Sequence, residues 1–272
     1  MSQSLRALGT TELRVSPLGL GTVKLGRTGG VKYPRPYSLP SDAEATALLN
    51  RASELGINLV DTAPAYGLAE ERLGRLLEGR RFDWIIATKA GEEFDPGSGT
   101  SRFDFSAGAV TASVERSLRR LRTDFVDIVL LHSDGRDEWV LRDSGGLDAL
   151  ERLKEQGKTK TVGISTKTVA GGLAAVHSGR CDVLMVTYNP RDTAERVVID
   201  AAAARGIGVL VKKALLSGHV GAAAEGSHRT RPDECLTFAL APSGVSSVIV
   251  GTINPDHLAE NVRAALAALA GS

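Results

Sequence analysis

Short apolar runs alternate with amphipathic segments along almost the whole chain. The runs are rich in β-branched residues and nearly continuous, which is typical of parallel strands covered on both faces. The expected strands are Val15–Gly21, Asn58–Asp61, Trp84–Lys89, Phe125–His132, Thr159–Ser165, Val183–Thr187, Val209–Lys212 and Ser247–Val250. The expected helices, one after each strand, are Asp42–Leu55, Glu70–Leu77, Ser106–Leu121, Gly146–Gln156, Thr168–Ser178, Thr193–Arg205, Pro232–Leu240 and Pro255–Leu269.

This regular alternation predicts the fold class. Parallel strands need right-handed crossovers, and eight strand–helix units can close into a (β/α)₈ (TIM) barrel. The chain has 272 residues, close to the roughly 250 that such a barrel needs, so we expect residues 1–272 to form a single domain. A short N-terminal β-hairpin is expected at Leu5–Leu13, around Gly9-Thr10-Thr11, where it would plug the bottom of the barrel.

Three connections are longer than simple turns. They are Arg27–Pro40, Glu92–Phe105 and Leu216–Arg231, and all are rich in glycine or polar residues. Each follows a predicted strand, so we expect all three at the C-terminal mouth of the barrel, where the active sites of this fold lie.

Composition and charge narrow the class of protein. Hydrophobic residues make up 42% and charged residues 24%, an ordinary globular composition. The net charge of +1 provides no long-range field for nucleic acid or an anionic membrane. We find no run long enough to span a membrane and no secretory signal in residues 1–10. Cys181 and Cys235 form no metal-binding or disulfide pattern, so we expect a cytoplasmic protein without a metal.

Polar residues end three neighbouring strands. Asp61 ends the second strand and is followed by Tyr66, Lys89 ends the third, and His132 ends the fourth. In a barrel, a carboxylate, a phenol, an ammonium and an imidazole would therefore meet at the mouth. Each of them alone has an ordinary structural interpretation as a cap, a packing aromatic, a solvated lysine or a core histidine. Their combination on one rim indicates catalysis.

The charges of this group suit proton transfer to a carbonyl oxygen. A tyrosine with a pKa near 10 is a weak acid at neutral pH, and a nearby cation lowers that pKa. We therefore expect Lys89, held by Asp61, to lower the pKa of Tyr66. His132 would orient the substrate oxygen by a hydrogen bond.

The sequence resembles the aldo-keto reductase family nearly from end to end. The block Gly56–Gly67, which contains Asp61 and Tyr66, resembles the family's most diagnostic motif. The other matching blocks, in chain order, are Gly19–Thr22, Ser117–Asp127 with Leu130–His132, Val162–Ser165, Tyr188–Pro190, and Val248–Gly251 with Glu260–Val262. The resemblance implies a catalytic tetrad of Asp61, Tyr66, Lys89 and His132.

The resemblance also implies a nicotinamide dinucleotide bound without a Rossmann fold. The sequence agrees, because Gly19 and Gly21 are not followed by the third glycine of that motif. The last helix would direct its N-terminal end toward the adenosine phosphates. The implied cofactor contacts are Gly21, Thr22, Asp61, Ser165, Leu215, Ser217, Thr252, Glu260 and Asn261.

The chain departs from the family pattern where the nicotinamide would lie. Thr166 replaces an asparagine and Met185 a glutamine, both of which normally hold the carboxamide. Lys212-Lys213 replaces an aromatic–serine pair whose aromatic ring stacks on the nicotinamide. A lysine stem could cover that face, or the ammonium could reach the pyrophosphate; the alternative is a pair of surface lysines.

The resemblance favours NADP(H), with NAD(H) as the alternative. In many members of the family, basic residues near the final strand bind the adenosine 2′-phosphate of NADP(H). The corresponding positions in this chain are Gly251 and His257. The segment Gly251–Asn261 contains no lysine or arginine.

We therefore expect reversible NAD(P)H-dependent reduction of an aldehyde or ketone, with Tyr66 as proton donor. One alternative is a cofactor-binding regulatory or sensor subunit with little turnover. Another is a metal-dependent barrel hydrolase, which the spacing of the five histidines does not favour. Val23, Tyr66, His132 and Trp139 are the candidate substrate contacts, with Tyr33 or Tyr37 as a further apolar wall. The sequence indicates neither the physiological substrate nor the oligomeric state.

Overall fold

Eight parallel strands form a closed barrel in the computed structural model, which describes residues 4–31, 33–34, 36–219 and 231–271. Each strand pairs with the next along the chain, and the last pairs with the first. The predicted (β/α)₈ barrel is confirmed. Its strands are β3 (Leu18–Gly21), β4 (Leu59–Asp61), β5 (Ile85–Ala90), β8 (Val126–His132), β9 (Thr159–Ser165), β10 (Val183–Thr187), β11 (Gly208–Lys212) and β12 (Val245–Val250).

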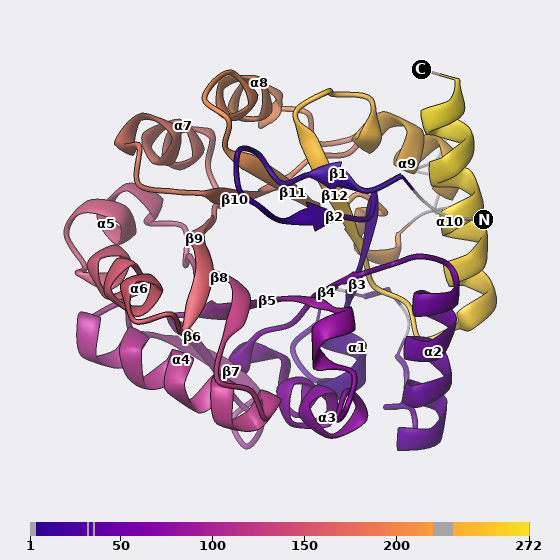
Figure 1. Ribbon diagram of the computed structural model, residues 1–272, viewed down its shortest axis with the longest axis horizontal. Coiled ribbons are helices and arrows are strands. Elements are labelled where there is room, and N and C mark those ends of the chain that lie inside the picture. The colour runs from indigo at the N-terminus through magenta and orange to yellow at the C-terminus, as the bar shows by residue number, and fades with distance from the viewer. Residues whose placement is uncertain (1–3, 32, 35, 220–230, 272) are drawn as a thin grey trace.

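Helices surround the barrel on all sides (Figure 1). The eight expected ones are α2 (Asp42–Glu54), α3 (Ala69–Leu76), α4 (Ala107–Leu121), α6 (Gly146–Glu155), α7 (Val169–Ser178), α8 (Arg196–Ala204), α9 (Pro232–Leu240) and α10 (Pro255–Ala270). Their ends follow local chemistry, as at α2, where Ser41 and Glu44 form a reciprocal capping box. Two short helices, α1 (Val23–Gly26) and α5 (Asp137–Arg142), were not predicted.

The N-terminal hairpin closes one end of the barrel. Strands β1 (Arg6–Ala7) and β2 (Arg14–Val15) pair antiparallel, and the turn places Leu8 among the inward-facing side chains of the barrel. The hairpin is therefore confirmed, but the predicted first strand Val15–Gly21 was too long. Val15 belongs to the hairpin, and the barrel strand begins after Pro17, which has no N–H to donate.

A second hairpin stands at the opposite end of the barrel. Strands β6 (Glu92–Asp95) and β7 (Thr100–Phe103) pair antiparallel within the segment expected to be an irregular loop. The hairpin packs against η1 (Pro64–Tyr66), and it therefore lies over the mouth of the barrel. Of the predicted loop Leu216–Arg231, the residues 220–230 lie outside the described part of the chain.

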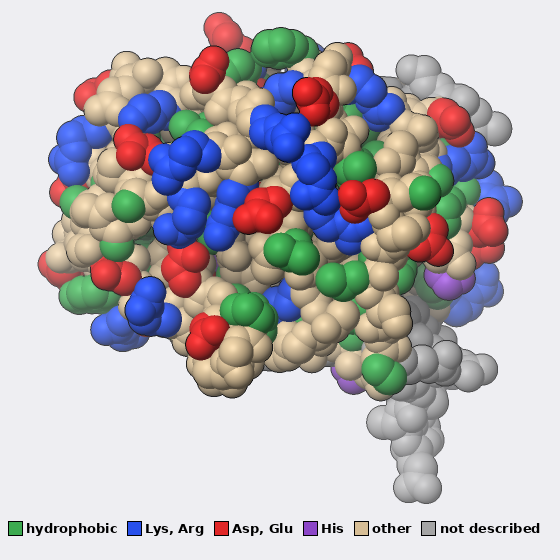
Figure 2. Space-filling view, turned by 90° about the horizontal axis from the view of Figure 1, so that it is seen from below, with side chains coloured by type: hydrophobic (Ala, Val, Ile, Leu, Met, Phe, Trp, Pro, Cys, Tyr) green, Lys and Arg blue, Asp and Glu red, His purple; other side chains and the backbone are tan. Residues whose placement is uncertain are grey.

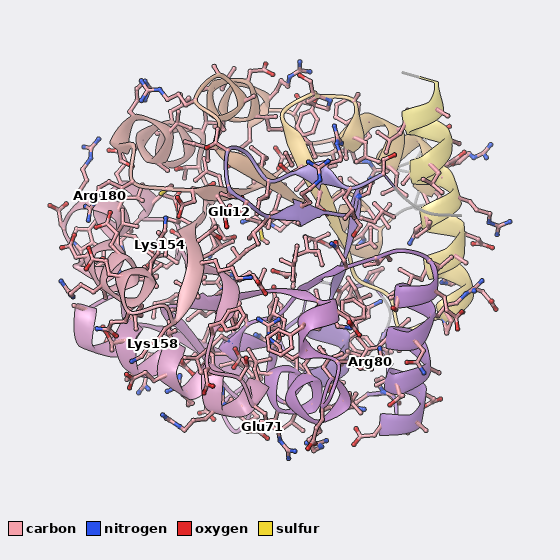
Figure 3. All side chains as sticks on the ribbon, in the orientation of Figure 1. Glu12, Glu71, Arg80, Lys154, Lys158 and Arg180 are labelled. Atoms are coloured by element: carbon pink, nitrogen blue, oxygen red, sulfur yellow. The ribbon has the colours of Figure 1, made fainter. Side chains whose placement is uncertain are left out.

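Charged side chains lie mostly on the outer helices, where they pair. In Figure 3, Lys154, Lys158 and Arg180 lie at the periphery, and Lys154 is 2.6 Å from Asp182. Figure 2 shows lysine and arginine side chains gathered on one face, with acidic side chains among them. Arg75 of α3 pairs with Asp42 of α2, and Arg122, just after α4, pairs with Glu78, each at 3.0 Å. None of the described helices is both long and apolar enough to cross a membrane.

Candidate active site

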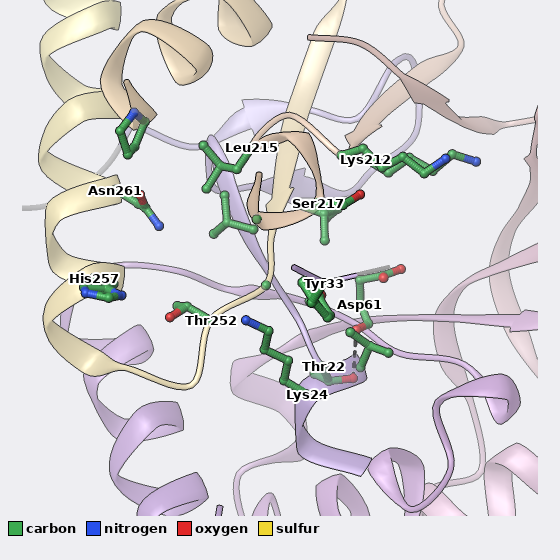
Figure 4. A pocket seen from close by; sticks show the side chains of 18 of the residues that line it. Thr22, Lys24, Tyr33, Asp61, Lys212, Leu215, Ser217, Thr252, His257 and Asn261 are labelled. Atoms are coloured by element: carbon green, nitrogen blue, oxygen red, sulfur yellow. Dashed lines mark hydrogen bonds between the residues drawn. The ribbon is translucent and has the colours of Figure 1, made fainter. Parts of the chain in front are cut away.

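A cavity of about 790 Å³ lies at the C-terminal mouth of the barrel. One end contains the side chains at the ends of β4, β5 and β8. The other end reaches the first turns of α10, where Figure 4 shows Thr252, His257 and Asn261 on one side of the cavity. The shape suits an extended ligand whose two ends meet different chemical groups.

The four predicted catalytic residues lie together at the inner end of this cavity. Asp61 and His132 are the last residues of β4 and β8, Lys89 is in β5, and Tyr66 ends the 3₁₀ turn η1. Because these strands are adjacent in the barrel, their C-terminal ends share one rim. All four side chains line the cavity.

The position of Tyr66 depends on a close approach between two glycines. Gly67, which follows Tyr66, has a φ of +63°, and a Cβ there would lie 2.3 Å from the carbonyl oxygen of Gly26. A Cβ on Gly26 would in turn lie 2.3 Å from the carbonyl oxygen of Tyr66. Any side chain at either glycine would therefore push the Tyr66 turn away from the end of α1.

Lys89 and Asp61 form a buried ion pair. Nζ of Lys89 lies 2.6 Å from Oδ1 of Asp61 and donates a second hydrogen bond to the carbonyl oxygen of Thr62 at 2.9 Å. Both side chains are at most 4% exposed. The Tyr66 hydroxyl lies 3.5 Å from Oδ2 of Asp61, and Nζ lies 4.7 Å from the centre of the Tyr66 ring.

The pKa of Tyr66 shifts in the direction opposite to the expected one. Burial raises the pKa of Tyr66 well above its ordinary value, and the charges of Asp61 and Glu92 raise it further. The Lys89 ammonium is already paired with Asp61, so its positive charge is largely offset at the phenol. Tyr66 is therefore a neutral hydrogen-bond donor at all physiological pH values.

His132 has an acidic partner that sequence analysis missed. Its Nδ1 lies 2.8 Å from Oε2 of Glu92, and the rings of His132 and Tyr66 are edge to face with centroids 6.3 Å apart. Burial lowers the pKa of His132, while Glu92 raises it in part. The pKa of Glu92 falls to about 2, because its contacts with His132 and Ser101 outweigh the opposing effect of burial.

Lys212 lies inside the site, and its ammonium is directed toward the end of β9. Its Nζ donates to Oγ of Ser165 at 2.8 Å and to the carbonyl oxygen of Thr166 at 2.6 Å. Burial lowers the pKa of Lys212 to about 7, although the charge of Glu195 opposes this shift. The ammonium therefore lies beside Ser165 at the end of β9, which contradicts the interpretation of Lys212 as a surface lysine. Its contact with the nicotinamide or the pyrophosphate remains a prediction. Lys213, in contrast, is exposed and has a positive φ of 58°.

Most of the predicted binding residues line the cavity. Those that do, besides the tetrad, are Gly21, Thr22, Val23, Tyr33, Ser165, Met185, Lys212, Lys213, Leu215, Ser217, Gly251, Thr252, His257, Glu260 and Asn261. Thr166 and Trp139 do not. Thr166 is fully buried, and its hydroxyl donates to Glu195 at 3.1 Å.

Trp139 is not among the residues that line the cavity, and it belongs to α5, which Asp137 anchors. The Asp137 carboxylate accepts the N–H groups of Lys167 and Thr168 at 3.0 and 2.8 Å. Trp139 instead packs against Phe105 and beneath the Arg136 guanidinium, with 41% of its surface exposed. Its contact with substrate remains a prediction.

Basic residues that the sequence pattern did not indicate also line the cavity: Lys24, Lys167 and Arg231. Figure 4 shows the Lys24 side chain directed toward Thr252, and its Nζ lies 4.2 Å from the centre of the Tyr33 ring. These residues lie far from the Gly251–Asn261 segment in the sequence, so a search of that segment could not find them. In the described part of the chain, no three His, Cys, Asp or Glu side chains form a potential metal site.

A closed (β/α)₈ barrel with a phenol, an imidazole and a buried Lys–Asp pair at its C-terminal mouth defines a barrel enzyme. Residues 17–234 match the model of the aldo/keto reductase family. The chain belongs to this family of oxidoreductases, whose members use nicotinamide cofactors and act on small molecules. The predicted family is therefore confirmed.

Proteins and structures similar to this chain agree with this assignment. L-galactose dehydrogenase of Arabidopsis thaliana is 32% identical over 96% of this chain and 87% of its own length. D-threo-aldose 1-dehydrogenase of a Pseudomonas species is 27% identical over 96% and 92%. A crystal structure of a putative aldo-keto reductase from Pseudomonas aeruginosa superposes with a TM-score of 0.86 at 49% identity and covers 97% of this chain and 95% of that one.

Proposed function

We propose that the protein catalyses the reversible NAD(P)H-dependent reduction of an aldehyde or ketone to an alcohol, with Tyr66 as the proton donor to the reacting oxygen. The observation that carries the proposal is the convergence of Tyr66, His132 and the Lys89–Asp61 pair at the inner end of one extended cavity. Two hydrogen-bonding side chains on one wall can hold a carbonyl oxygen where charge develops.

The residues present fit a nicotinamide dinucleotide. The lining of the cavity includes the cationic residues Lys24, Lys213 and Arg231 and the first turn of α10, all of which suit phosphate groups. The inner part is lined by Ser165, Met185 and Lys212 next to the tetrad. The cofactor would supply the hydride when bound. The protein would supply orientation, exclusion of water and control of the proton.

A direct assay tests this function. The purified protein is incubated with NADPH or NADH and a panel of aldehydes and ketones, and with the oxidised cofactors and L-galactose or other aldoses. We expect cofactor-dependent turnover in at least one direction, followed by the absorbance of reduced nicotinamide. Tight cofactor binding without turnover on the panel would favour the sensor interpretation and contradict the proposal.

Lys24 is the basic residue best placed to bind the 2′-phosphate of NADPH. Its ammonium is directed toward Thr252 at the end of the cavity that α10 lines (Figure 4). We expect Lys24→Met to weaken NADPH binding about tenfold, a typical effect of losing one charge-assisted contact, and to change NADH binding less than about twofold. Dissociation constants from nucleotide fluorescence measure both. Equal losses for the two cofactors would show that Lys24 contacts a part that they share.

A further inference from the structure

Lys212 places a positive charge at the inner end of the cavity. The residue ends strand β11, and its Nζ donates to Oγ of Ser165 and to the carbonyl oxygen of Thr166. Ser165 in turn pairs in register with His132 on the neighbouring strand β8. The ammonium therefore lies one hydrogen bond away from the part of the rim where His132 lies.

No direct ion pair neutralises this ammonium. Both of its hydrogen-bond partners are uncharged, and in the described part of the chain no carboxylate forms an ion pair with it. The Glu195 carboxylate acts on Lys212 only from a greater distance. Lys89 differs, because Asp61 lies 2.6 Å from its Nζ. The charge of Lys212 is therefore less compensated than that of Lys89.

The proposed reaction brings the nicotinamide ring to this end of the cavity. A hydride passes to a carbonyl carbon only over a short distance, and the proposed function places the carbonyl oxygen at Tyr66 and His132. The ring then lies beside the wall that contains Ser165, Met185 and Lys212. These three residues come from β9, β10 and β11, which are adjacent in the barrel. Figure 4 shows Lys212 on the side of the cavity away from the first turns of α10.

An ammonium at this position affects the two redox states of the ring differently. The ring is neutral in the reduced cofactor and carries one positive charge in the oxidised cofactor, whereas the phosphates and the adenosine are the same in both. Two like charges about 6 to 10 Å apart at a partly buried site repel by an amount equivalent to roughly 10- to 100-fold in a dissociation constant. Lys212 therefore opposes the oxidised form alone.

We infer that Lys212 selects the redox state of the bound cofactor, because its ammonium weakens the binding of NAD(P)⁺ relative to NAD(P)H. This inference rests on the proposed function. In carbonyl reduction, the hydride passes from the reduced ring to the carbonyl carbon, Tyr66 gives its proton to the oxygen, and the ring is left with the charge that the ammonium repels. The oxidised cofactor then leaves more readily, and the reduced form replaces it.

The selection depends on pH, because Lys212 titrates near neutrality. Burial lowers its pKa to about 7, and the charges of Lys213 and Lys89 also lower it. The charges of Glu195 and Asp137 oppose this shift. Below this pKa the ammonium is present and the reduced form is preferred, and above it the amine is neutral and the preference weakens. By linkage, binding of the oxidised form lowers the pKa of Lys212 further and releases a proton.

The test compares the dissociation constants of NADP⁺ and NADPH, measured by titration calorimetry from about pH 6 to 9. Their ratio cancels every contribution that the two forms share. We expect Kd(NADP⁺)/Kd(NADPH) of the unaltered protein to fall about tenfold across this range. In Lys212→Met, the ratio should be about tenfold lower at the acidic end and nearly independent of pH. Lys212→Arg, which stays charged, should keep a high ratio throughout.

Lys213→Met is the matched control. Lys213 is the next residue and also lines the cavity, but it is exposed to solvent, which screens its charge. We expect this variant to keep the ratio within about twofold. His132 is a second titratable group beside Lys212, and its pKa is lowered by burial and by the charges of Lys89 and Lys212. Because Lys212→Met retains His132, a pH dependence that persists in that variant would belong to His132.

A second measurement needs no variant. Calorimetry of the unaltered protein near pH 7, repeated in buffers with different ionisation enthalpies, gives the number of protons released on binding. We expect NADP⁺ to release about half a proton more than NADPH does. This difference tests the inference even where Lys212→Met fails to fold.

A ratio that is the same in the unaltered protein and in Lys212→Met would overturn the inference, as would equal proton release with the two forms. Selection of the reduced form with the expected pH dependence, but without turnover of any carbonyl compound, would support the inference and contradict the proposed catalysis. Failure to bind either form of the cofactor would contradict both.

Discussion

Replacing Tyr66 by phenylalanine is expected to lower kcat for carbonyl reduction by about 10²- to 10⁴-fold, the usual contribution of a positioned acid. The cofactor dissociation constant should change less than about twofold, because the substitution keeps the ring. The fold should persist as well, since the lost hydroxyl makes only a 3.5 Å contact with Asp61. Steady-state kinetics and a fluorescence titration of the cofactor measure the two quantities.

A neighbouring tyrosine provides the control. The Tyr37 hydroxyl donates to the carbonyl oxygen of Arg27, near the cavity but not among its lining residues. Tyr37→Phe should therefore retain kcat within about threefold, the modest cost of one hydrogen bond. Near-normal turnover in Tyr66→Phe would remove Tyr66 from the proposed chemistry, whatever Tyr37→Phe shows.

Replacing Lys89 by methionine is expected to destabilise the protein by about 3–5 kcal/mol, because it leaves the Asp61 carboxylate buried without its partner. The two side chains are at most 4% exposed and lie 2.6 Å apart, so solvent cannot compensate for the lost cation. The free energy of unfolding from denaturant titration at neutral pH measures the loss.

A double variant distinguishes the contribution of the ion pair from the cost of leaving the Asp61 carboxylate unpaired. Lys89→Met combined with Asp61→Leu removes both charges, and apolar replacement of a buried ion pair is often close to neutral. We expect the double variant to be more stable than Lys89→Met alone, although it should be inactive. A loss below about 1 kcal/mol in the single variant would show that Asp61 finds another partner or becomes protonated.

The barrel could be predicted from sequence because its signal is local and repeated. A strand such as Val126–His132 is a continuous apolar run, and a helix such as Pro255–Ala270 begins at a proline after a capping asparagine. The β6–β7 hairpin was missed, although Asp95-Pro96-Gly97 between two alternating segments is a turn signal. The four-residue α1 is too short to show a helical period.

Sequence analysis could predict a residue of the candidate site only where that residue lies at or just after the end of a predicted strand. Asp61, Lys89 and His132 follow directly from their strands, and Tyr66 follows Asp61 through a short turn. Glu92 was missed because its contact with His132 depends on how a hairpin folds back over the barrel. The pKa of Tyr66 is raised, opposite to expectation, because the phenol is buried beside the charges of Asp61 and Glu92, an environment that no sequence pattern provides.

The hairpin β6–β7 is an addition to the barrel, since none of its residues belongs to a barrel strand. A carboxylate beside the catalytic imidazole thus comes from a module that insertions or substitutions could alter while the eight strands stay the same. Members of one enzyme family could in this way acquire different pH optima, or different preferences between oxidation and reduction, by changing an accessory ribbon alone.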